Sequence, residues 1–255
     1  MIEDLQSKVI LITGASTGIG AAAAVAFGRN KAKVVVHYNS SEPEANNVAK
    51  QVIEAGGEAI IMQGDVRDSK VCKQLVSDTV KHFGEINVLI NNAGGLIKRR
   101  GVEEIDDSLF AEVVDLNSKS ALMTTGAAVM AMRRQGKGGG IINVTSIAAR
   151  HGGAGGSVLY ASSKGFISTM TRGFAKELVK DKIRVNAVSP GVIVTPFHDR
   201  YSTPELLENF RTTIPMDRLG DSDECAGAFL FLASEELSSY ITGQIMEVNG
   251  GQLMP

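Results

Sequence analysis

The stretch that decides the fold reads Thr13-Gly14-Ala15-Ser16-Thr17-Gly18-Ile19-Gly20. It lies between an apolar run, residues 9–13, and an alanine-rich segment that is typical of a helix. Glycines are needed here because the turn uses backbone angles that are costly for other residues, and because the main chain must approach a pyrophosphate closely. The N-terminus of the helix then offers free N–H groups and a positive dipole end to the phosphates. The stretch therefore predicts a phosphate-binding turn after the first strand.

Outward from this turn, short runs rich in Val and Ile alternate with longer segments that have apolar residues at three- and four-residue spacing. Such runs are typical of parallel strands buried on both faces, and the alternation predicts βαβ units with right-handed crossovers. The sequence therefore predicts an α/β protein: one doubly wound Rossmann domain, residues 1–255, with a seven-stranded parallel sheet. The expected strands are residues 9–13, 34–38, 59–63, 88–91, 141–146, 184–189 and 245–248.

The bulk composition excludes several classes of partner. Lys plus Arg total 26 and Asp plus Glu total 28, so the net charge of −2 indicates neither nucleic acid nor an anionic membrane as partner. No apolar stretch approaches the roughly 20 residues that span a bilayer, and the polar start, with Glu3 and Asp4, is not typical of a signal peptide. Two distant cysteines, Cys72 and Cys225, are expected to be reduced thiols, and the scattered histidines predict no metal site. We expect a cytoplasmic protein.

The spacing of the turn, Gly-x-x-x-Gly-x-Gly, resembles that of the short-chain dehydrogenase/reductase family. Further motifs resemble the same family and extend over essentially the whole chain: Asn91-Asn92-Ala93-Gly94, Tyr160-x-x-x-Lys164, Pro190-Gly191 and Ile241-Thr242-Gly243-Gln244. Jointly they are specific for the compact, single-domain members. The resemblance implies an NAD(P)(H)-dependent oxidoreductase that interconverts a carbonyl and a secondary alcohol by hydride transfer.

Four residues form the expected catalytic set. Tyr160 and Lys164 are four apart and share one face of a helix, and a nearby ammonium group lowers the pKa of a phenol. Tyr160 would therefore act as acid in reduction and as base in oxidation. Ser146, at the end of the fifth expected strand, can bond the substrate oxygen as charge develops on it. By resemblance, Asn117 is the fourth member and anchors a water that connects Lys164 to solvent.

The loop before Tyr160 departs from the family pattern. Ser146 precedes Tyr160 by fourteen residues, across a glycine-rich stretch at residues 152–156. The family commonly has a spacing about one residue shorter. We expect the extra residue to be absorbed in this flexible stretch.

The resemblance also assigns residues to the cofactor. Asp65 is expected to accept a hydrogen bond from the adenine amino group, and Val66 to flank the ring. The other expected contacts are in the glycine turn, at the end of the second strand and in the later motifs: Gly14, Ser16, Thr17, Gly18, Ile19, Tyr38, Asn39, Ser40, Asn92, Ala93, Gly94, Tyr160, Lys164, Pro190, Gly191, Val192, Ile193 and Thr195.

The end of the second strand bears on the choice of cofactor. Tyr38 stands where NAD enzymes of the family usually carry Asp, so the main barrier to the 2′-phosphate of NADP is missing. Residues 39–41, Asn-Ser-Ser, can donate hydrogen bonds to a phosphate, and His37 would add partial positive charge. The arginines that usually mark NADP enzymes are also absent, at Thr17 and Asn39. We expect NADP(H) to be favoured and NAD(H) to remain possible.

The substrate is not named by these motifs. Residues 196–215 predict a helical lid that excludes water and shapes the pocket together with residues 94–101 and 147–159. The basic triplet Lys98-Arg99-Arg100 either attracts an acidic substrate or acyl-carrier protein, or is a solvated loop. The leading interpretation is a small-molecule carbonyl or alcohol substrate. The alternatives are 3-oxoacyl-[acyl-carrier-protein] reductase and a non-catalytic, cofactor-sensing regulator.

Two segments predict self-association. Residues 109–132 and 160–179 carry more apolar side chains than one buried helix face needs. Members of the family commonly pair these helices in tetramers, so the resemblance implies a homotetramer.

Overall fold

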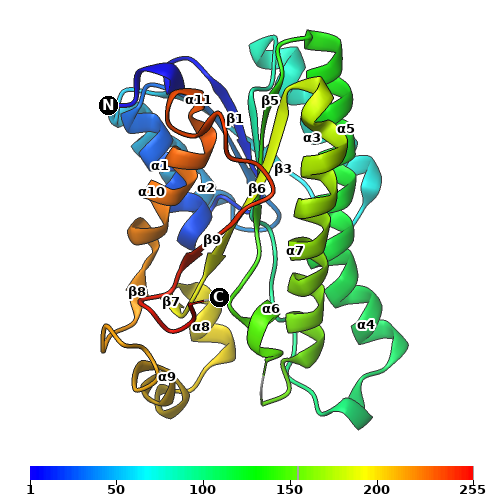
Figure 1. Ribbon diagram of the computed structural model, residues 1–255, viewed down its shortest axis with the longest axis vertical. Helices are drawn as coiled ribbons and strands as arrows, with labels where there is room; N and C mark the ends of the chain where they lie inside the picture. Colours follow the sequence, from blue (N-terminus) through cyan, green and yellow to red (C-terminus); the bar gives the residue numbers. More distant parts are fainter. Residues whose placement is uncertain (154, 255) are drawn as a thin grey trace.

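A seven-stranded parallel sheet forms the centre of the molecule (Figure 1). This computed structural model describes residues 1–153 and 155–254. The strands follow the order β3-β2-β1-β4-β5-β6-β9, so the predicted doubly wound sheet is confirmed. Their bounds are β1 Val9–Ile12, β2 Lys33–Tyr38, β3 Glu58–Gln63, β4 Val88–Asn91, β5 Gly139–Val144, β6 Ile183–Pro190 and β9 Ile245–Val248.

Helices cover both faces of this sheet, with α1, α2 and α10 on one face and α3, α5 and α7 on the other (Figure 1). The α-helices are α1 Gly18–Arg29, α2 Glu42–Glu54, α3 Ser69–Phe83, α4 Asp107–Val114, α5 Ser120–Gln135, α6 Ala148–His151, α7 Val158–Leu178, α8 Pro196–Tyr201, α9 Pro204–Arg211, α10 Ser222–Ala233 and α11 Glu235–Ser238. Short 3₁₀ segments lie at η1 Glu3–Leu5, η2 Val102–Glu104 and η4 Val179–Asp181, and η3 Asp115–Lys119 is a π-helical turn.

The strand side chains alternate between two apolar cores. Ile10 and Ile12 face a core that contains Phe27 of α1 and Phe229 of α10. Leu11, between them, faces the second core, formed with α3, α5 and α7. Both faces of the sheet are therefore buried, as the near-continuous apolar runs predicted.

The strand order reverses at β1, which pairs with β2 on one side and with β4 on the other. From β1 the chain adds β2 and β3 on one side of the sheet and then crosses to β4 on the other side. The connections that leave β1 and β4 therefore run in opposite directions. In open α/β sheets the crevice for a ligand lies outside the carboxyl ends of the strands at such a point. The fold therefore places the glycine turn and the segment after β4 at one crevice.

Strand bounds differ from the prediction mainly at β5. It begins at Gly139 and ends at Val144, because the ladder with β6 pairs Gly139 with Ile183 and Val144 with Val188. Ser146 therefore lies two residues beyond the strand, and not at its end as predicted. A second, two-stranded parallel sheet, β7 Ile193–Val194 with β8 Gly220–Asp221, was not predicted.

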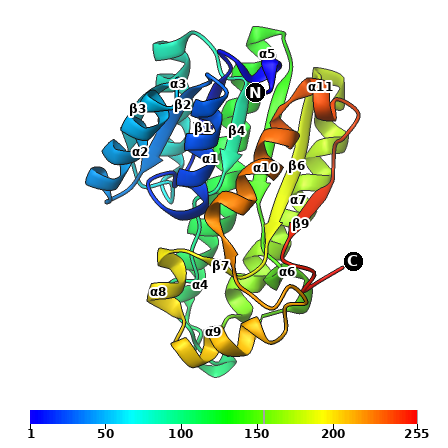
Figure 2. The same cartoon turned by 90° about the vertical axis from the view of Figure 1, so that its left-hand side faces the viewer.

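The predicted lid is helical. Helices α8 and α9 lie between β7 and β8, below the carboxyl ends of the main strands (Figure 2). The short β7–β8 ladder brings the two ends of this insertion together. Residues 196–215 are thereby held at the same edge of the sheet as the glycine turn.

None of the described helices combines the length and apolarity that a membrane span requires. Both Cys72 and Cys225 are free and buried. Within residues 1–153 and 155–254, no group of three His, Cys, Asp or Glu side chains is arranged to hold a metal ion.

Candidate active site

A cavity of about 660 Å³ opens at the carboxyl edge of the sheet. This volume lies within the range of pockets that bind small molecules and cofactors. Most of the residues expected from the sequence line it: Gly14, Ser16, Thr17, Gly18, Ile19, Asn39, Ser40, Asp65, Val66, Asn92, Ala93, Gly94, Ser146, Tyr160, Lys164, Pro190, Gly191, Val192, Ile193 and Thr195. The chain thus brings together side chains that are far apart in the sequence.

The glycine turn is held closely against the segment after β4. Gly14 has φ +62°, and a Cβ there would lie 2.9 Å from the Cα of Ala93, so both conformation and space require glycine. The side-chain amide of Asn92 donates to the carbonyls of Thr13 and Gly14, at 3.0 and 2.8 Å. A side chain at position 14 would fill the space between the glycine turn and Ala93. With glycine there the space stays open, and it fits the pyrophosphate of a dinucleotide at the N-terminus of α1.

Two expected residues do not line the cavity. Tyr38 follows Val34 and Val36 on one face of β2, and its side chain is 5% exposed within the α1 and α2 core. The period of two along the strand could have placed it there from the sequence. Asn117 is 1% exposed, in the η3 turn behind the cavity wall.

The amide of Asn117 is fully engaged with the main chain. Its Nδ2 donates to the carbonyls of Gly95 and Val113, at 2.8 and 2.9 Å, and its Oδ1 accepts from the Gly95 N–H at 2.9 Å. A Cβ on Gly94 would lie 2.7 Å from this Oδ1 and 3.0 Å from Lys164 Nζ. The side chain of Asn117 therefore fixes the loop next to Lys164, and its expected role as the anchor of a water stays a prediction.

His37 is neutral and does not supply the partial positive charge that was expected. Its Nδ1 accepts from the N–H of Gly14, and its Nε2 donates to the carbonyl of Gly64, both at 2.9 Å. Burial lowers the pKa of the imidazole, and one acceptor and one donor nitrogen are the pattern of the neutral ring. His37 thus ties the turn after β1 to the end of β3.

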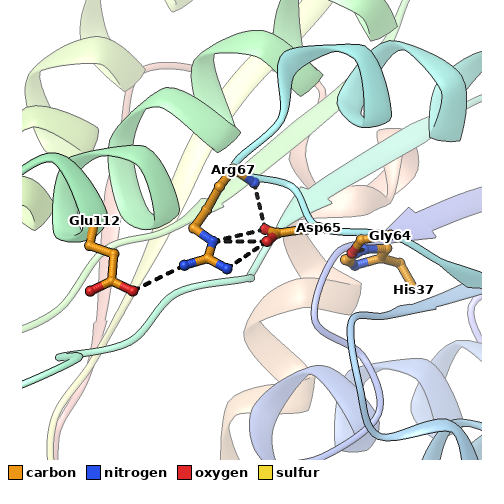
Figure 3. A network of polar contacts seen from close by, with 5 residues as sticks. All are labelled: His37, Gly64, Asp65, Arg67 and Glu112. Atoms are coloured by element: carbon orange, nitrogen blue, oxygen red, sulfur yellow. Dashed lines mark hydrogen bonds and ion pairs between the residues drawn. The ribbon is translucent and has the colours of Figure 1, made fainter.

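Arg67, which the sequence reasoning missed, holds Asp65 (Figure 3). The guanidinium donates through Nε and Nη2 to both carboxylate oxygens, and through Nη1 to Glu112 of α4 at 3.1 Å. These hydrogen bonds keep the pKa of Asp65 below its ordinary value. A carboxylate oxygen can accept more than one hydrogen bond, so Asp65 retains capacity for an adenine amino group. The sequence does contain a signal for this ion pair, because a basic residue stands two positions after Asp65, the expected adenine contact.

Tyr160, Lys164 and Ser146 meet in the middle of the cavity. Both Tyr160 and Lys164 belong to α7, and the Tyr160 hydroxyl lies close enough to the Ser146 side chain for the serine to lower its pKa. Lys164 Nζ donates to the carbonyl of Val144 at 2.8 Å and lies 5.8 Å from the centroid of the Tyr160 ring. The end of β5 therefore positions both the lysine and the serine.

Burial controls the protonation of this group. Desolvation raises the pKa of Tyr160 to about 12, against the lowering effect of its hydrogen bond with Ser146. Desolvation also lowers the pKa of Lys164 to about 8. The net shift of the Tyr160 pKa is thus upward, opposite to the lowering that was expected from Lys164. At neutral pH the tyrosine is protonated and the lysine is largely charged.

The predicted lid segment, residues 196–215, packs directly on Tyr160. The ring of Phe197, in α8, lies 5.8 Å from the Tyr160 ring, and Tyr201 lies 4.9 Å from Phe197. Leu206 and Phe210 of α9 also line the cavity. The wall of the cavity next to Tyr160 is therefore largely apolar.

The fold and this cavity define an enzyme of the Rossmann type, with a protonated tyrosine beside a dinucleotide cradle. A family model described as enoyl-(acyl carrier protein) reductase matches residues 14–252. The chain belongs to the short-chain dehydrogenase/reductase family and is an oxidoreductase that uses a nicotinamide cofactor. The alternative of a non-catalytic regulator is not supported.

Several relatives extend over almost the whole chain. A 3-oxoacyl-[acyl-carrier-protein] reductase of Synechocystis sp. is 38% identical over 254 residues, 98% of each protein. A solved NADH-dependent reductase A1-R′, responsible for alginate metabolism, is 40% identical, has a TM-score of 0.91 and is matched over 99% of this chain and 100% of that one. A short-chain type dehydrogenase/reductase from Mycobacterium marinum is 32% identical, with a TM-score of 0.94 and coverage of 100% and 98%.

Proposed function

We propose that this protein reduces the carbonyl group of a small molecule to a secondary alcohol, with Tyr160 as the proton donor. The observation that carries the proposal is the partly buried Tyr160, next to the Ser146 side chain and with its ring centroid 5.8 Å from Lys164 Nζ, in a cavity that also contains the glycine turn. When bound, the nicotinamide supplies the hydride. The protein supplies orientation, polarisation and the proton.

The roles of the four residues follow from their positions. Tyr160 keeps its proton at neutral pH and can donate it to the substrate oxygen. Ser146 bonds that oxygen as negative charge develops on it. Lys164 holds a positive charge near the phenolate that remains, and Asn117 is a positioning residue that fixes Gly95 next to the lysine.

The experiment that tests this function is a carbonyl panel with NADPH and NADH, followed by the loss of cofactor absorbance. We expect turnover of at least one small aldehyde, ketone or oxo acid, and slower oxidation of the matching alcohol at neutral pH, because Tyr160 starts as an acid. Failure of every carbonyl compound in the panel, with cofactor bound, would contradict the proposed function.

For the cofactor, we propose that NADP(H) is favoured and NAD(H) is also used. Asn39, Ser40 and Ser41 line the cavity, and no carboxylate in residues 37–41 repels a 2′-phosphate. These donors are neutral and His37 is uncharged, so the gain from the phosphate is modest. The NADH-dependent relative supports the use of the second cofactor. The same panel tests this point: we expect kcat/KM to differ by less than about tenfold, equivalent to roughly 1.4 kcal/mol.

A second candidate is a 3-oxoacyl-[acyl-carrier-protein] reductase, favoured by the Synechocystis relative. Its substrate would be a neutral thioester that enters past the lid. The panel should therefore include a 3-oxoacyl thioester, and a preference for it would select this candidate.

We further propose that the chain works as a single cofactor-binding domain, that residues 196–215 act as its lid, and that it functions in the cytoplasm. The contact between Phe197 and Tyr160 supports the role of the lid. The cavity, with a volume of about 660 Å³, suits a small-molecule substrate together with a dinucleotide.

We also propose a homotetramer, and its mass can be predicted. Phe110 of α4, Met130 of α5 and Phe166 of α7 are 54%, 60% and 45% exposed, on the segments expected to pair. We expect light scattering to give four times the mass of the chain, and Phe166→Glu to give a smaller species, because it places a charge in the apolar contact. Tyr240→Glu, at a fully exposed position outside these helices, is the matched control. A monomeric mass for the unmodified protein would contradict the tetramer.

A further inference from the structure

Three consecutive residues at the end of β5 meet Tyr160 and Lys164 of α7. The carbonyl of Val144 accepts a hydrogen bond from Lys164 Nζ at 2.8 Å. The hydroxyl of Thr145 donates to the main-chain carbonyl of Lys164 at 2.9 Å. Ser146, the next residue, lies beside the Tyr160 side chain. The end of β5 therefore holds Lys164 at two points, its main chain and its ammonium group.

The main chain of Thr145 is itself fixed to the sheet. Its N–H donates to the carbonyl of Val188 in β6 at 2.9 Å, and the N–H of Ile147 donates to the carbonyl of Pro190 at 3.0 Å. The contacts between β5 and β6 thus continue beyond the last residue of β5. Thr145 is 2% exposed, so its hydroxyl lies between a rigid part of the sheet and α7.

A second hydroxyl completes the contact with α7. Ser168 is one helical turn after Lys164, and its Oγ lies 2.8 Å from Thr145 Oγ1 and donates to the carbonyl of Lys164 at 3.1 Å. Buried hydroxyls are costly unless they are hydrogen-bonded, and both of these have partners. A satisfied buried polar group favours a single arrangement, whereas apolar side chains can slide past one another. The contact therefore fixes the position of α7 against β5 at Lys164.

The same strand and helix share another polar contact farther from the cavity. Asn143 Nδ2 donates to Thr171 Oγ1 at 2.9 Å, and Thr171 donates to the carbonyl of Ile167 at 2.8 Å. Thr171 is fully buried and is seven residues beyond Lys164, about 10 Å along the helix axis. The two contacts join the same elements at different distances from Lys164, so variants at positions 145 and 171 separate positioning from stability.

We propose that Thr145 is a positioning residue for the reaction, which fixes the main chain of Lys164 so that the ammonium group stays beside Tyr160. The inference rests on the proposed function and adds a residue to it. Ser146 belongs to the strand side and Tyr160 to α7, so a shift of the helix would separate the two hydroxyls. A displacement of about 1 Å in an active site can cost roughly 10²-fold in rate.

The kinetic test begins with Thr145→Val, which removes the hydroxyl and keeps the shape of the side chain. We expect kcat for carbonyl reduction to fall by roughly 10- to 100-fold, because Lys164 and Tyr160 lose their alignment with Ser146. KM for the carbonyl substrate should stay almost the same, as for an effect confined to the transition state. Thr145→Ser keeps the hydroxyl and should restore most of kcat.

Thr171→Val is the matched control, because it removes a buried hydroxyl from a contact between the same two elements. It should lower the Tm and leave kcat unchanged. Equal losses of kcat in Thr171→Val and Thr145→Val would overturn the inference, because they would indicate a general loosening of α7. Should Thr145→Val fail to fold, Thr145→Ala removes the same hydroxyl without a methyl group in its place.

The titration of Lys164 decides the case without turnover. Burial lowers the pKa of Lys164 to about 8. In protein labelled with ¹³C at the lysine Cε atoms, the NMR resonance that is missing from Lys164→Met is that of Lys164. We expect its titration midpoint to rise in Thr145→Val, because the released ammonium group reaches the water of the cavity, and to stay in place in Thr145→Ser and Thr171→Val.

The two measurements distinguish failure of the inference from failure of the proposed function. An unchanged midpoint in Thr145→Val, with kcat also unchanged, would overturn the inference and leave the proposed function standing. A raised midpoint in Thr145→Val without turnover of any carbonyl compound by the unmodified protein would contradict the proposed function. It would still support the contact through which Thr145 holds Lys164.

Discussion

Tyr160→Phe will lower kcat by roughly 10²- to 10⁴-fold, the range expected for loss of a general acid. The substitution removes one oxygen from a partly buried ring that keeps its packing against Phe197. The glycine turn and the Asn92 contacts are untouched, so the dissociation constant of the cofactor should stay almost the same. Single-turnover kinetics with NADPH and fluorescence titration of the cofactor measure the two quantities separately.

The matched control for this variant is Tyr240→Phe. Tyr240 is fully exposed, so removal of its hydroxyl should change neither kcat nor cofactor affinity. If Tyr160→Phe kept most of its turnover, the assignment of the proton donor would be wrong. Loss of cofactor binding together with turnover would instead indicate a structural role for the hydroxyl.

Lys164→Met will reduce kcat/KM for carbonyl reduction by roughly 10²- to 10³-fold, the scale measured when one electrostatic contact to the reacting group is removed. It will also change the pH profile. Burial lowers the pKa of Lys164 to about 8, so its charge is present below that pH and is lost above it. The pKa of Tyr160, raised to about 12, keeps the proton donor intact over the same interval.

Reduction by the unmodified protein should therefore decline as the pH rises through about 8, and the Lys164→Met variant should lack this decline. Lys176→Met, on the exposed side of the same helix, should retain the full profile. An alkaline decline in the Lys164→Met variant would show that another group controls it. The pH profile thus separates a charge effect from a loss of packing.

The sheet was predictable because its signals are local. The glycine turn and the Val- and Ile-rich runs depend on residues that are adjacent in the chain, and they gave seven strands in the main sheet. The bounds of β5 were less accurate, because Gly139 becomes a strand residue through its partner Ile183, which the local pattern does not reveal. The β7–β8 ladder has two residues in each strand, too short for any periodicity.

The spacing and the motifs of the sequence predict the catalytic residues. They do not predict the burial and the hydrogen-bond partners of these residues. The pKa of Tyr160 depends on the burial that α8 and the end of β5 impose, and no residue near it in the sequence indicates this. The local sequence predicts a charged His37, because it shows only the neighbours of this residue in β2. Its actual partners, Gly14 and Gly64, come from two other strand ends.

The contacts of His37 also make one end of the site sensitive to acid. Protonation would turn Nδ1 into a donor facing the N–H of Gly14, so the two groups would repel each other. The pKa of His37 is depressed below its ordinary value of 6.5 by burial, so the stability that it contributes is present above that pH and is lost as the pH falls through the lowered pKa. Mild acidification should therefore loosen the contacts between the glycine turn and the end of β3 before it affects Tyr160. We therefore expect the glycine-turn end of the crevice, and not the end that holds Tyr160, to be the acid-labile part.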